Sequence, residues 1–126
     1  MIMNNPVRIH RVSFRHAFQG FLHNIQTQPN FRFHLLAIIC VVLAGIYFSI
    51  STFEWFTLIF TFNMVLVAEM LNTTVEAMVD LITTERRVDA KVAKDVSAGM
   101  VLISAFFSIF IGLFIFIPKI LTILNL

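Results

Sequence analysis

Four polar side chains recur at helical spacing in the middle of the chain. Glu69, Asn72, Glu76 and Asp80 lie at offsets of 0, 3, 7 and 11 residues, and at about 100° per residue they stay within roughly 60° of one another on one face of a helix. We call these four residues the polar stripe. Carboxylates are costly in hydrocarbon, so ionisable residues inside a membrane are functional candidates by default. The structural alternative is interhelical hydrogen bonding that only fixes a helix bundle.

A basic and an acidic residue, Lys94 and Asp95, follow fourteen residues after Asp80. Alone, such a pair is usually a solvated charge pair at the start of a helix. Near the membrane depth of Asp80, a lysine can contact phosphate, and carboxylates can hold Mg²⁺ whose other ligands are water and phosphate oxygens. A further carboxylate, off the metal, can accept a proton from an attacking hydroxyl. These groups indicate phosphoryl transfer at a membrane surface, built without a Gly-rich Walker loop or a protein-kinase signature.

The composition identifies the solvent of these residues as a bilayer. Of 126 residues, 59% are hydrophobic and 13% are charged, whereas a soluble domain carries about 25% charged residues. A soluble core of this length could not hide so much apolar surface, and aqueous disorder is excluded for the same reason. The single Cys40 excludes a disulfide framework, a Cys-based zinc site and an iron–sulfur cluster. We expect one integral membrane domain over residues 1–126, with no signal peptide in residues 1–32.

Three apolar segments can cross a bilayer, since about 20 helical residues span ~30 Å of hydrocarbon. Residues 33–53 and 96–118 are uncharged apart from His34, and residues 55–82 are interrupted only by the polar stripe. With three crossings, eight of the nine Lys and Arg residues fall on one side of the membrane. The excess of positive charge on cytoplasmic segments then places the N-terminus and the loop over residues 83–95 in the cytoplasm.

The segment before the first span has the pattern of an amphipathic helix. Apolar residues recur at three- and four-residue steps from Phe14 to Ile25, and polar residues form the opposite face. We expect a helix over about residues 8–28 that lies on the cytoplasmic membrane surface and is ended or bent by Pro29. The predicted fold class is an all-α membrane protein with three transmembrane helices preceded by this amphipathic interfacial helix. Three helices cannot enclose a large site alone, so we expect a homo-oligomer with sites between protomers.

Two other classes of protein would share these features. A small proton- or ion-coupled transporter subunit would also carry buried Glu and Asp residues, but that interpretation leaves Lys94 and Asp95 unexplained. It also does not explain why the polar stripe continues to the cytoplasmic face. The second alternative is a catalytically weakened membrane scaffold. We expect no nucleic-acid partner in any of these cases.

Several motifs together match a known pattern: Glu69-x-x-Asn72-x-x-x-Glu76-x-x-x-Asp80, the triplet Ala93-Lys94-Asp95, the segment Asn30–Leu36, and Gly20. With these motifs the chain resembles the prokaryotic diacylglycerol kinase and undecaprenol kinase family over roughly residues 14–118. The resemblance implies ATP- and Mg²⁺-dependent phosphorylation of a membrane lipid hydroxyl, giving the lipid phosphate and ADP. It also implies a homotrimer with composite sites between subunits, in the bacterial cytoplasmic (inner) membrane.

The resemblance further implies a role for each matching residue. Glu69 would be the general base that takes the proton from the lipid hydroxyl, and Glu76 would hold the metal ion. The nucleotide site would consist of His16, Asn72, Glu76, Asp80, Glu85, Arg86, Arg87, Lys94 and Asp95. The lipid site would consist of Glu69, Phe31, Arg32 and Ala98, with Ser97 as an alternative neighbour of the lipid.

The chain departs from the family pattern at a second metal position. The family usually has a Glu there, whereas this chain has Gln28, a neutral oxygen ligand that holds Mg²⁺ less tightly. His16 replaces an aromatic residue that contacts nucleotide in some members. The segments Lys94–Gly99 and Asn30–Leu35 look more like the undecaprenol kinase branch, so we expect undecaprenol as the lipid, with diacylglycerol next.

Overall fold

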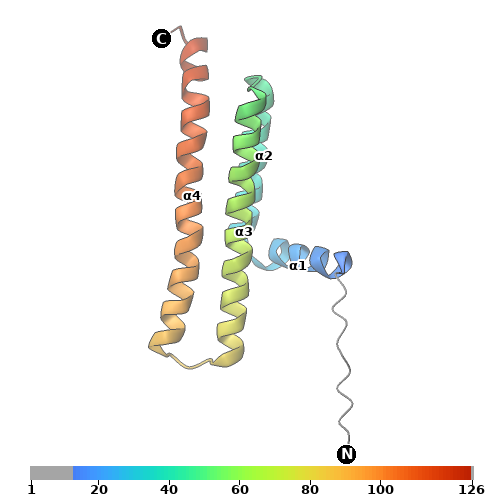
Figure 1. The fold of residues 1–126 in the computed structure, drawn as a ribbon, viewed down its shortest axis with the longest axis vertical. Coiled ribbons are helices and arrows are strands. Elements are labelled where there is room, and N and C mark those ends of the chain that lie inside the picture. The colour runs from blue at the N-terminus through green and yellow to red at the C-terminus, as the bar shows by residue number, and fades with distance from the viewer. Residues whose placement is uncertain (1–12, 126) are drawn as a thin grey trace, which may run out of the picture.

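The protein is described by a computed structural model over residues 13–125. Within that range it forms four helices: α1 (Phe14–Thr27), α2 (Pro29–Tyr47), α3 (Thr52–Ile82) and α4 (Val88–Ile123). The last three run alongside one another as a bundle, and α1 projects from its side (Figure 1). Helices α2, α3 and α4 are each long and apolar enough to cross a membrane. The predicted fold class, an all-α membrane protein whose three spans follow an amphipathic helix, is confirmed.

The helices extend differently from the apolar runs that marked them in the sequence. Helix α2 begins at Pro29 and ends at Tyr47, before the expected limit of residue 53, while α4 extends beyond residues 96–118 at both ends. At about 1.5 Å per residue, the 31 residues of α3 and the 36 of α4 span roughly 46 and 54 Å, against ~30 Å of hydrocarbon. The hairpin of α3 and α4 is therefore long enough to carry its polar end into water.

Helix α1 starts at an N-cap, where the Ser13 hydroxyl accepts a hydrogen bond of 3.4 Å from the backbone N–H of His16. Expected helical residues 8–12 lie outside the part of the chain that the structure describes. The helix ends at Thr27 and α2 begins at Pro29, as the proline predicted. The rings of the fully buried Phe31 and of Phe21 meet in a T-shaped pair with their centroids 5.4 Å apart, which fixes α1 against α2.

The turn between α2 and α3 is closed by hydrogen bonds and by a close approach of two side chains. Ser49, at φ 49°, donates its backbone N–H to the Ile46 carbonyl, and the Ile50 N–H reaches the Gly45 carbonyl at 3.1 Å. This is the Schellman arrangement of a helix C-terminus. The Trp55 ring occupies the space where a Cβ on Gly45 would lie.

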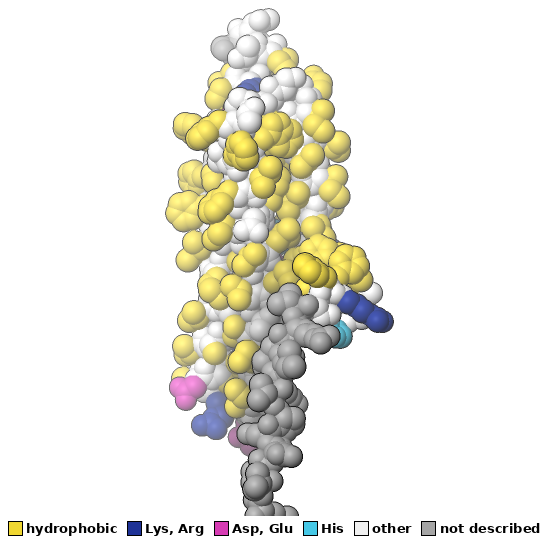
Figure 2. Space-filling view, turned by 45° about the vertical axis from the view of Figure 1, so that its right-hand side comes forward, with side chains coloured by type: hydrophobic (Ala, Val, Ile, Leu, Met, Phe, Trp, Pro, Cys, Tyr) yellow, Lys and Arg dark blue, Asp and Glu magenta, His cyan; other side chains and the backbone are white. Residues whose placement is uncertain are grey.

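An ion pair joins α3 to α4 at the end of the bundle opposite their connecting loop. The Ser51 hydroxyl and the Glu54 carboxylate cap the first turn of α3 reciprocally, and Glu54 Oε1 lies 3.0 Å from Lys119 Nζ of α4. About one helical turn further along each helix, toward the connecting loop, Leu58 and Ile115 belong to a small buried core. On the face that Figure 2 shows, apolar side chains cover most of the height of the bundle, charged groups gather at the hairpin end, and a basic side chain lies on α1.

Candidate functional site

The polar stripe begins at a buried carboxylate. Glu69 is only 2% exposed and faces a hollow of about 250 Å³, which we call the base hollow. The residues that line it include Asn30, Phe33 and His34 of α2, Glu69 and Asn72 of α3, and Ala98 of α4. The structure thus brings Glu69 and Ala98, two of the residues expected at the lipid, into one space between α2, α3 and α4.

One oxygen of the Glu69 carboxylate has no hydrogen-bond partner. Its Oε1 atom is buried and unpaired among the described residues, and the nearest basic group is His34 Nε2 at 3.5 Å. That separation exceeds the usual length of about 2.7–3.2 Å for a hydrogen bond from nitrogen to oxygen. A buried acceptor without a donor is costly in a folded protein, so this oxygen is available to a group that enters the hollow.

Next along the stripe, Asn72 is held from both sides. Ser97 Oγ of α4 donates to Asn72 Oδ1 at 2.7 Å, and Asn72 Nδ2 donates to Glu76 Oε1 at 3.2 Å. The Ser97 side chain is almost fully buried, at 1% exposure. A hydroxyl on α4 therefore sets the orientation of an amide on α3, which in turn positions the Glu76 carboxylate.

At the hairpin end, Lys94 and Asp95 each form an ion pair, but with other partners than each other. Lys94 Nζ lies 2.5 Å from Asp80 Oδ1, and Lys91 pairs with Asp95 one turn apart on α4. Both pairs are largely exposed, so their net contribution to stability is about 0–1 kcal/mol each. What these pairs do is hold charged side chains in place at the end of the bundle where α3 and α4 are connected.

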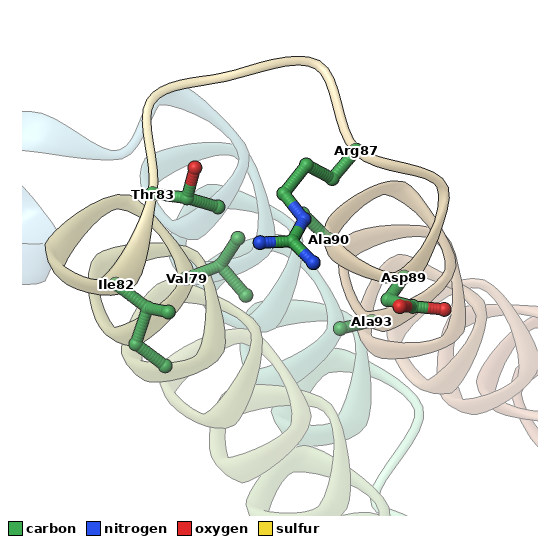
Figure 3. Close-up of a pocket in the computed structure, with 7 residues that line it drawn as sticks. All are labelled: Val79, Ile82, Thr83, Arg87, Asp89, Ala90 and Ala93. Atoms are coloured by element: carbon green, nitrogen blue, oxygen red, sulfur yellow. The ribbon is translucent and has the colours of Figure 1, made fainter.

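These charges line a second space, which we call the loop hollow. It measures about 570 Å³ and lies under the α3–α4 connection. Six residues expected at the nucleotide line it: Asp80, Glu85, Arg86, Arg87, Lys94 and Asp95. On its other side the Arg87 guanidinium reaches between the end of α3 and the start of α4, toward Val79 and Ala90 (Figure 3). An anion in the loop hollow would meet basic side chains from the connection and from α4.

Four residues expected at the site lie elsewhere in the described chain. His16 is exposed on α1, with its Nδ1 3.1 Å from Gln19 Oε1. Phe31 is buried between α1 and α2 and does not line the base hollow. Arg32 donates to the Gln26 carbonyl at 3.4 Å, and Gln28 donates to the Thr27 hydroxyl at 3.3 Å. None of the four shares a hydrogen bond with the polar stripe within residues 13–125.

The carboxylates near Asn72 suit a metal ion that is bound partly by the protein and partly by the phosphate oxygens of a substrate. Over the described range, no three His, Cys, Asp or Glu side chains gather closely enough to hold an ion. Glu76 keeps one carboxylate oxygen outside its bond with Asn72. Mg²⁺ is commonly held by one or two carboxylates together with water and phosphate oxygens. Glu76 therefore fits as the protein ligand of a metal that arrives with a phosphate, and a site built from protein groups alone does not fit.

Sequence reasoning missed two connections that hold the site. The first is Ser97, which was expected only as an alternative neighbour of the lipid and not as a donor to Asn72. The second joins α1 to α3 beside the polar stripe: the Thr73 hydroxyl donates to Asn24 Oδ1 at 2.8 Å, and Asn24 is buried. A polar residue on the apolar side of an amphipathic helix is the sequence signal that would have found Asn24.

Comparison with known proteins gives three relatives and one family. The family model for prokaryotic diacylglycerol kinase matches residues 15–116. Over 107 residues the chain is 40% identical to the undecaprenol kinase of Bacillus subtilis, covering 85% of this chain and 87% of that protein. It is 33% identical over 114 residues to a diacylglycerol kinase of Synechocystis, covering 90% of this chain and 65% of the relative. A diacylglycerol kinase of Helicobacter pylori is 38% identical over 77 residues, 61% of this chain and 59% of the relative. The fold and the polar stripe described above agree with these matches, and the chain belongs to the prokaryotic diacylglycerol kinase family.

Proposed function

We propose that this protein is a membrane lipid kinase that transfers the γ-phosphoryl group of ATP to a lipid hydroxyl. The observation that carries the proposal is the position of Glu69: a buried carboxylate with a free oxygen, on the helix face that leads to Asp80 and Lys94. From Glu69 to Asp80 the stripe is about 16 Å long at ~1.5 Å per residue. The stripe can therefore join a lipid at membrane depth to a nucleotide in water.

In this mechanism the lipid enters the base hollow with its hydroxyl toward Glu69. The Glu69 carboxylate takes the hydroxyl proton while the lipid oxygen bonds to the γ-phosphorus and the bond from phosphorus to the ADP oxygen breaks. Lys94 and the arginines of the loop hollow stabilise charge on the phosphates. Glu76 would hold Mg²⁺, and the ion would neutralise charge on the transferred group. Gln28, which lines neither hollow of the single chain, would be a neutral second ligand at a site completed between subunits.

Undecaprenol is the lipid that we propose first, with diacylglycerol second. The relative with 40% identity is named an undecaprenol kinase, and it is covered over 87% of its length. The two relatives named diacylglycerol kinases are covered over 65% and 59% of theirs. The base hollow does not separate the two lipids by chemistry, because both present a primary hydroxyl at the membrane surface.

We further propose a homotrimer in the bacterial cytoplasmic membrane, with the N-terminus in the cytoplasm and the sites between subunits. The exposed apolar surface of α2 and α4 supports assembly within a bilayer. Both hollows are open on one side of the single chain, and this supports completion of each site by a neighbouring subunit. The excess of Lys and Arg on one side supports the orientation.

Transfer of radiolabelled phosphate from ATP to each lipid, in detergent micelles with Mg²⁺, tests the function. A labelled lipid phosphate identifies a kinase, and its yield with undecaprenol against diacylglycerol identifies the substrate. Proton flux in vesicles without nucleotide would instead identify a transporter. Glu69→Gln keeps the size of the side chain and is expected to lose at least about 10²-fold in kcat, the range for general-base catalysis.

Glu54→Gln is the matched control, because it makes the same change in the first turn of the same helix, about four turns before Glu69. Glu54 contacts Lys119 and caps α3, far from either hollow. It is expected to retain phosphate transfer. A Glu69→Gln variant that phosphorylates lipid at the parental rate would remove Glu69 from the role of base.

A further inference from the structure

A buried general base must lose its proton before the next turnover. The Glu69 side chain is 3% exposed, and its Oε1 atom has no hydrogen-bond partner among the described residues. A carboxyl group with so little accessible surface makes almost no direct contact with bulk water. Another group must take the proton from it and lead to a more exposed place.

His34 is the side chain placed to do this. Its Nε2 atom lies 3.5 Å from Glu69 Oε1, and its side chain is 16% exposed, several times more than that of Glu69. His34 lines the base hollow and also a smaller cavity of about 80 Å³ among α2, α3 and α4. An imidazole can accept a proton on one ring nitrogen and release it from the other, near neutral pH.

The surroundings of the pair contain few competing charges. From α3, the acidic groups facing this region are Glu69 itself and Glu76, two turns further on. The α4 residues that line the base hollow are uncharged: Ala98, Val101, Leu102 and Ala105. Helix α1 meets α3 through the neutral side chain of Asn24, and on α2 itself Arg32 is bonded to the Gln26 carbonyl.

We propose that His34 is a proton-relay residue that returns Glu69 to its ionised form after each transfer. This inference rests on the proposed function. After the phosphoryl step, the Glu69 carboxyl gives its proton to His34 Nε2, leaving a carboxylate and an imidazolium. The imidazolium then releases a proton to water from its ring, and the enzyme returns to its starting state with no net change in charge. A small side-chain rotation brings the 3.5 Å separation to bonding distance, as is common for groups that tighten only with substrate bound.

The relay acts after the chemistry, and this gives it a specific kinetic signature. His34→Gln keeps the size and an N–H donor toward Glu69 but cannot carry a proton. In rapid mixing of this variant with ATP and lipid, we expect a first turnover at close to the parental rate, because Glu69 starts ionised. We then expect a steady state slower by about 10²-fold, the contribution typical of a positioned proton-transfer group. The result is a burst of about one lipid phosphate per site, as expected when a step after the transfer limits the rate.

Two additional measurements complete the test. His34→Ala with added imidazole is expected to recover steady-state rate in proportion to the free-base concentration, while the rate of the first turnover is unchanged and the burst amplitude shrinks as the steady state recovers. His23→Gln, an exposed histidine on α1, is the control and is expected to show parental kinetics with no burst. In the parental protein, exchange of water for D₂O is expected to slow the steady state more than the first turnover.

The outcomes separate the relay from the function itself. An unchanged steady-state rate in His34→Gln would overturn the relay, and so would equal slowing of the first turnover and the steady state. If the variant fails to fold, an equal D₂O effect on both phases of the parental protein would overturn it instead. A parental protein that forms no lipid phosphate would overturn the proposed function and leave no reaction for His34 to serve.

Discussion

The Ser97 hydroxyl of α4 lies 2.7 Å from Asn72 Oδ1 of α3 and 2.8 Å from the Lys94 carbonyl of its own helix. One buried hydroxyl therefore links the two helices that carry the loop hollow. Because Ser97 donates to the amide oxygen, the amide nitrogen of Asn72 is directed to Glu76. The geometry of the proposed metal ligand thus depends on a serine that makes no direct hydrogen bond to it among the described residues.

Replacement of Ser97 by alanine should weaken this arrangement. Asn72 Oδ1 would lose its donor in a half-buried place, which costs about 1 kcal/mol in the free energy of unfolding, the lower end of the range for a buried acceptor. We expect a lower thermal midpoint in detergent and a higher KM for the ATP–Mg²⁺ complex, because the Asn72 amide can turn away from Glu76. Ser104→Ala, on the same helix, is the matched control and should change neither quantity. An unchanged KM in Ser97→Ala would show that Asn72 keeps its orientation without the serine.

The sequence predicted the stripe because one helix suffices to place it. Glu69, Asn72, Glu76 and Asp80 share a face by helical periodicity alone, and the structure places all four on α3. The bond from Ser97 joins residues 25 positions apart, and no local pattern encodes which side chains of two helices meet. For the same reason the sequence did not predict the relay role proposed for His34. That role rests on the 3.5 Å distance from His34 Nε2 to Glu69 Oε1, between residues far apart in the sequence.

The Asp80–Lys94 pair should serve charge placement more than stability. The side chains are 59% and 38% exposed, so a double-mutant cycle on Asp80→Asn and Lys94→Met should give a coupling free energy below about 1 kcal/mol. By contrast, Lys94→Met should reduce kcat/KM for ATP by about 10²-fold, since it removes a positive charge from the loop hollow. Lys119→Met, a matched change at the other end of α4, should retain kcat/KM. Equal losses in the two lysine variants would show a general effect on the helix.

Restoration of a carboxylate at position 28 should strengthen the binding of metal. Gln28 offers one neutral oxygen, and Mg²⁺ prefers charged oxygen ligands. In the proposed site, Gln28→Glu should therefore lower the Mg²⁺ concentration that gives half-maximal phosphate transfer. Gln26→Glu adds the same charge two residues earlier on exposed α1 and serves as the control for general electrostatic attraction. Equal shifts in the two variants would count against a ligand role for position 28.

Helix existence was easier to predict than helix ends. The long apolar runs predicted the spans because the bilayer requires about 20 apolar residues, but hydropathy continues through the turn at Ser49 and Ile50. There α2 ends where backbone hydrogen bonds close the turn. The capping box of Ser51 and Glu54 then starts α3. Capping and turn geometry fix these bounds, and an average over an apolar window does not detect them.

The Gly45–Trp55 approach provides the last prediction. A Cβ on Gly45 would lie 2.8 Å from Trp55 Cη2 and 3.0 Å from Ile50 Cδ1, so Gly45→Ala must displace a large ring in the small core. Such overpacking costs about 1–3 kcal/mol, and we expect a lower thermal midpoint with kcat nearly unchanged, because the turn lies at the far end of the bundle from the loop hollow. Gly112→Ala is the matched control: nothing lies within 4 Å of its added Cβ, and alanine is favoured over glycine within a helix by about 0.5–1 kcal/mol. A Gly45→Ala variant as stable as Gly112→Ala would show that the Trp55 ring moves aside without cost.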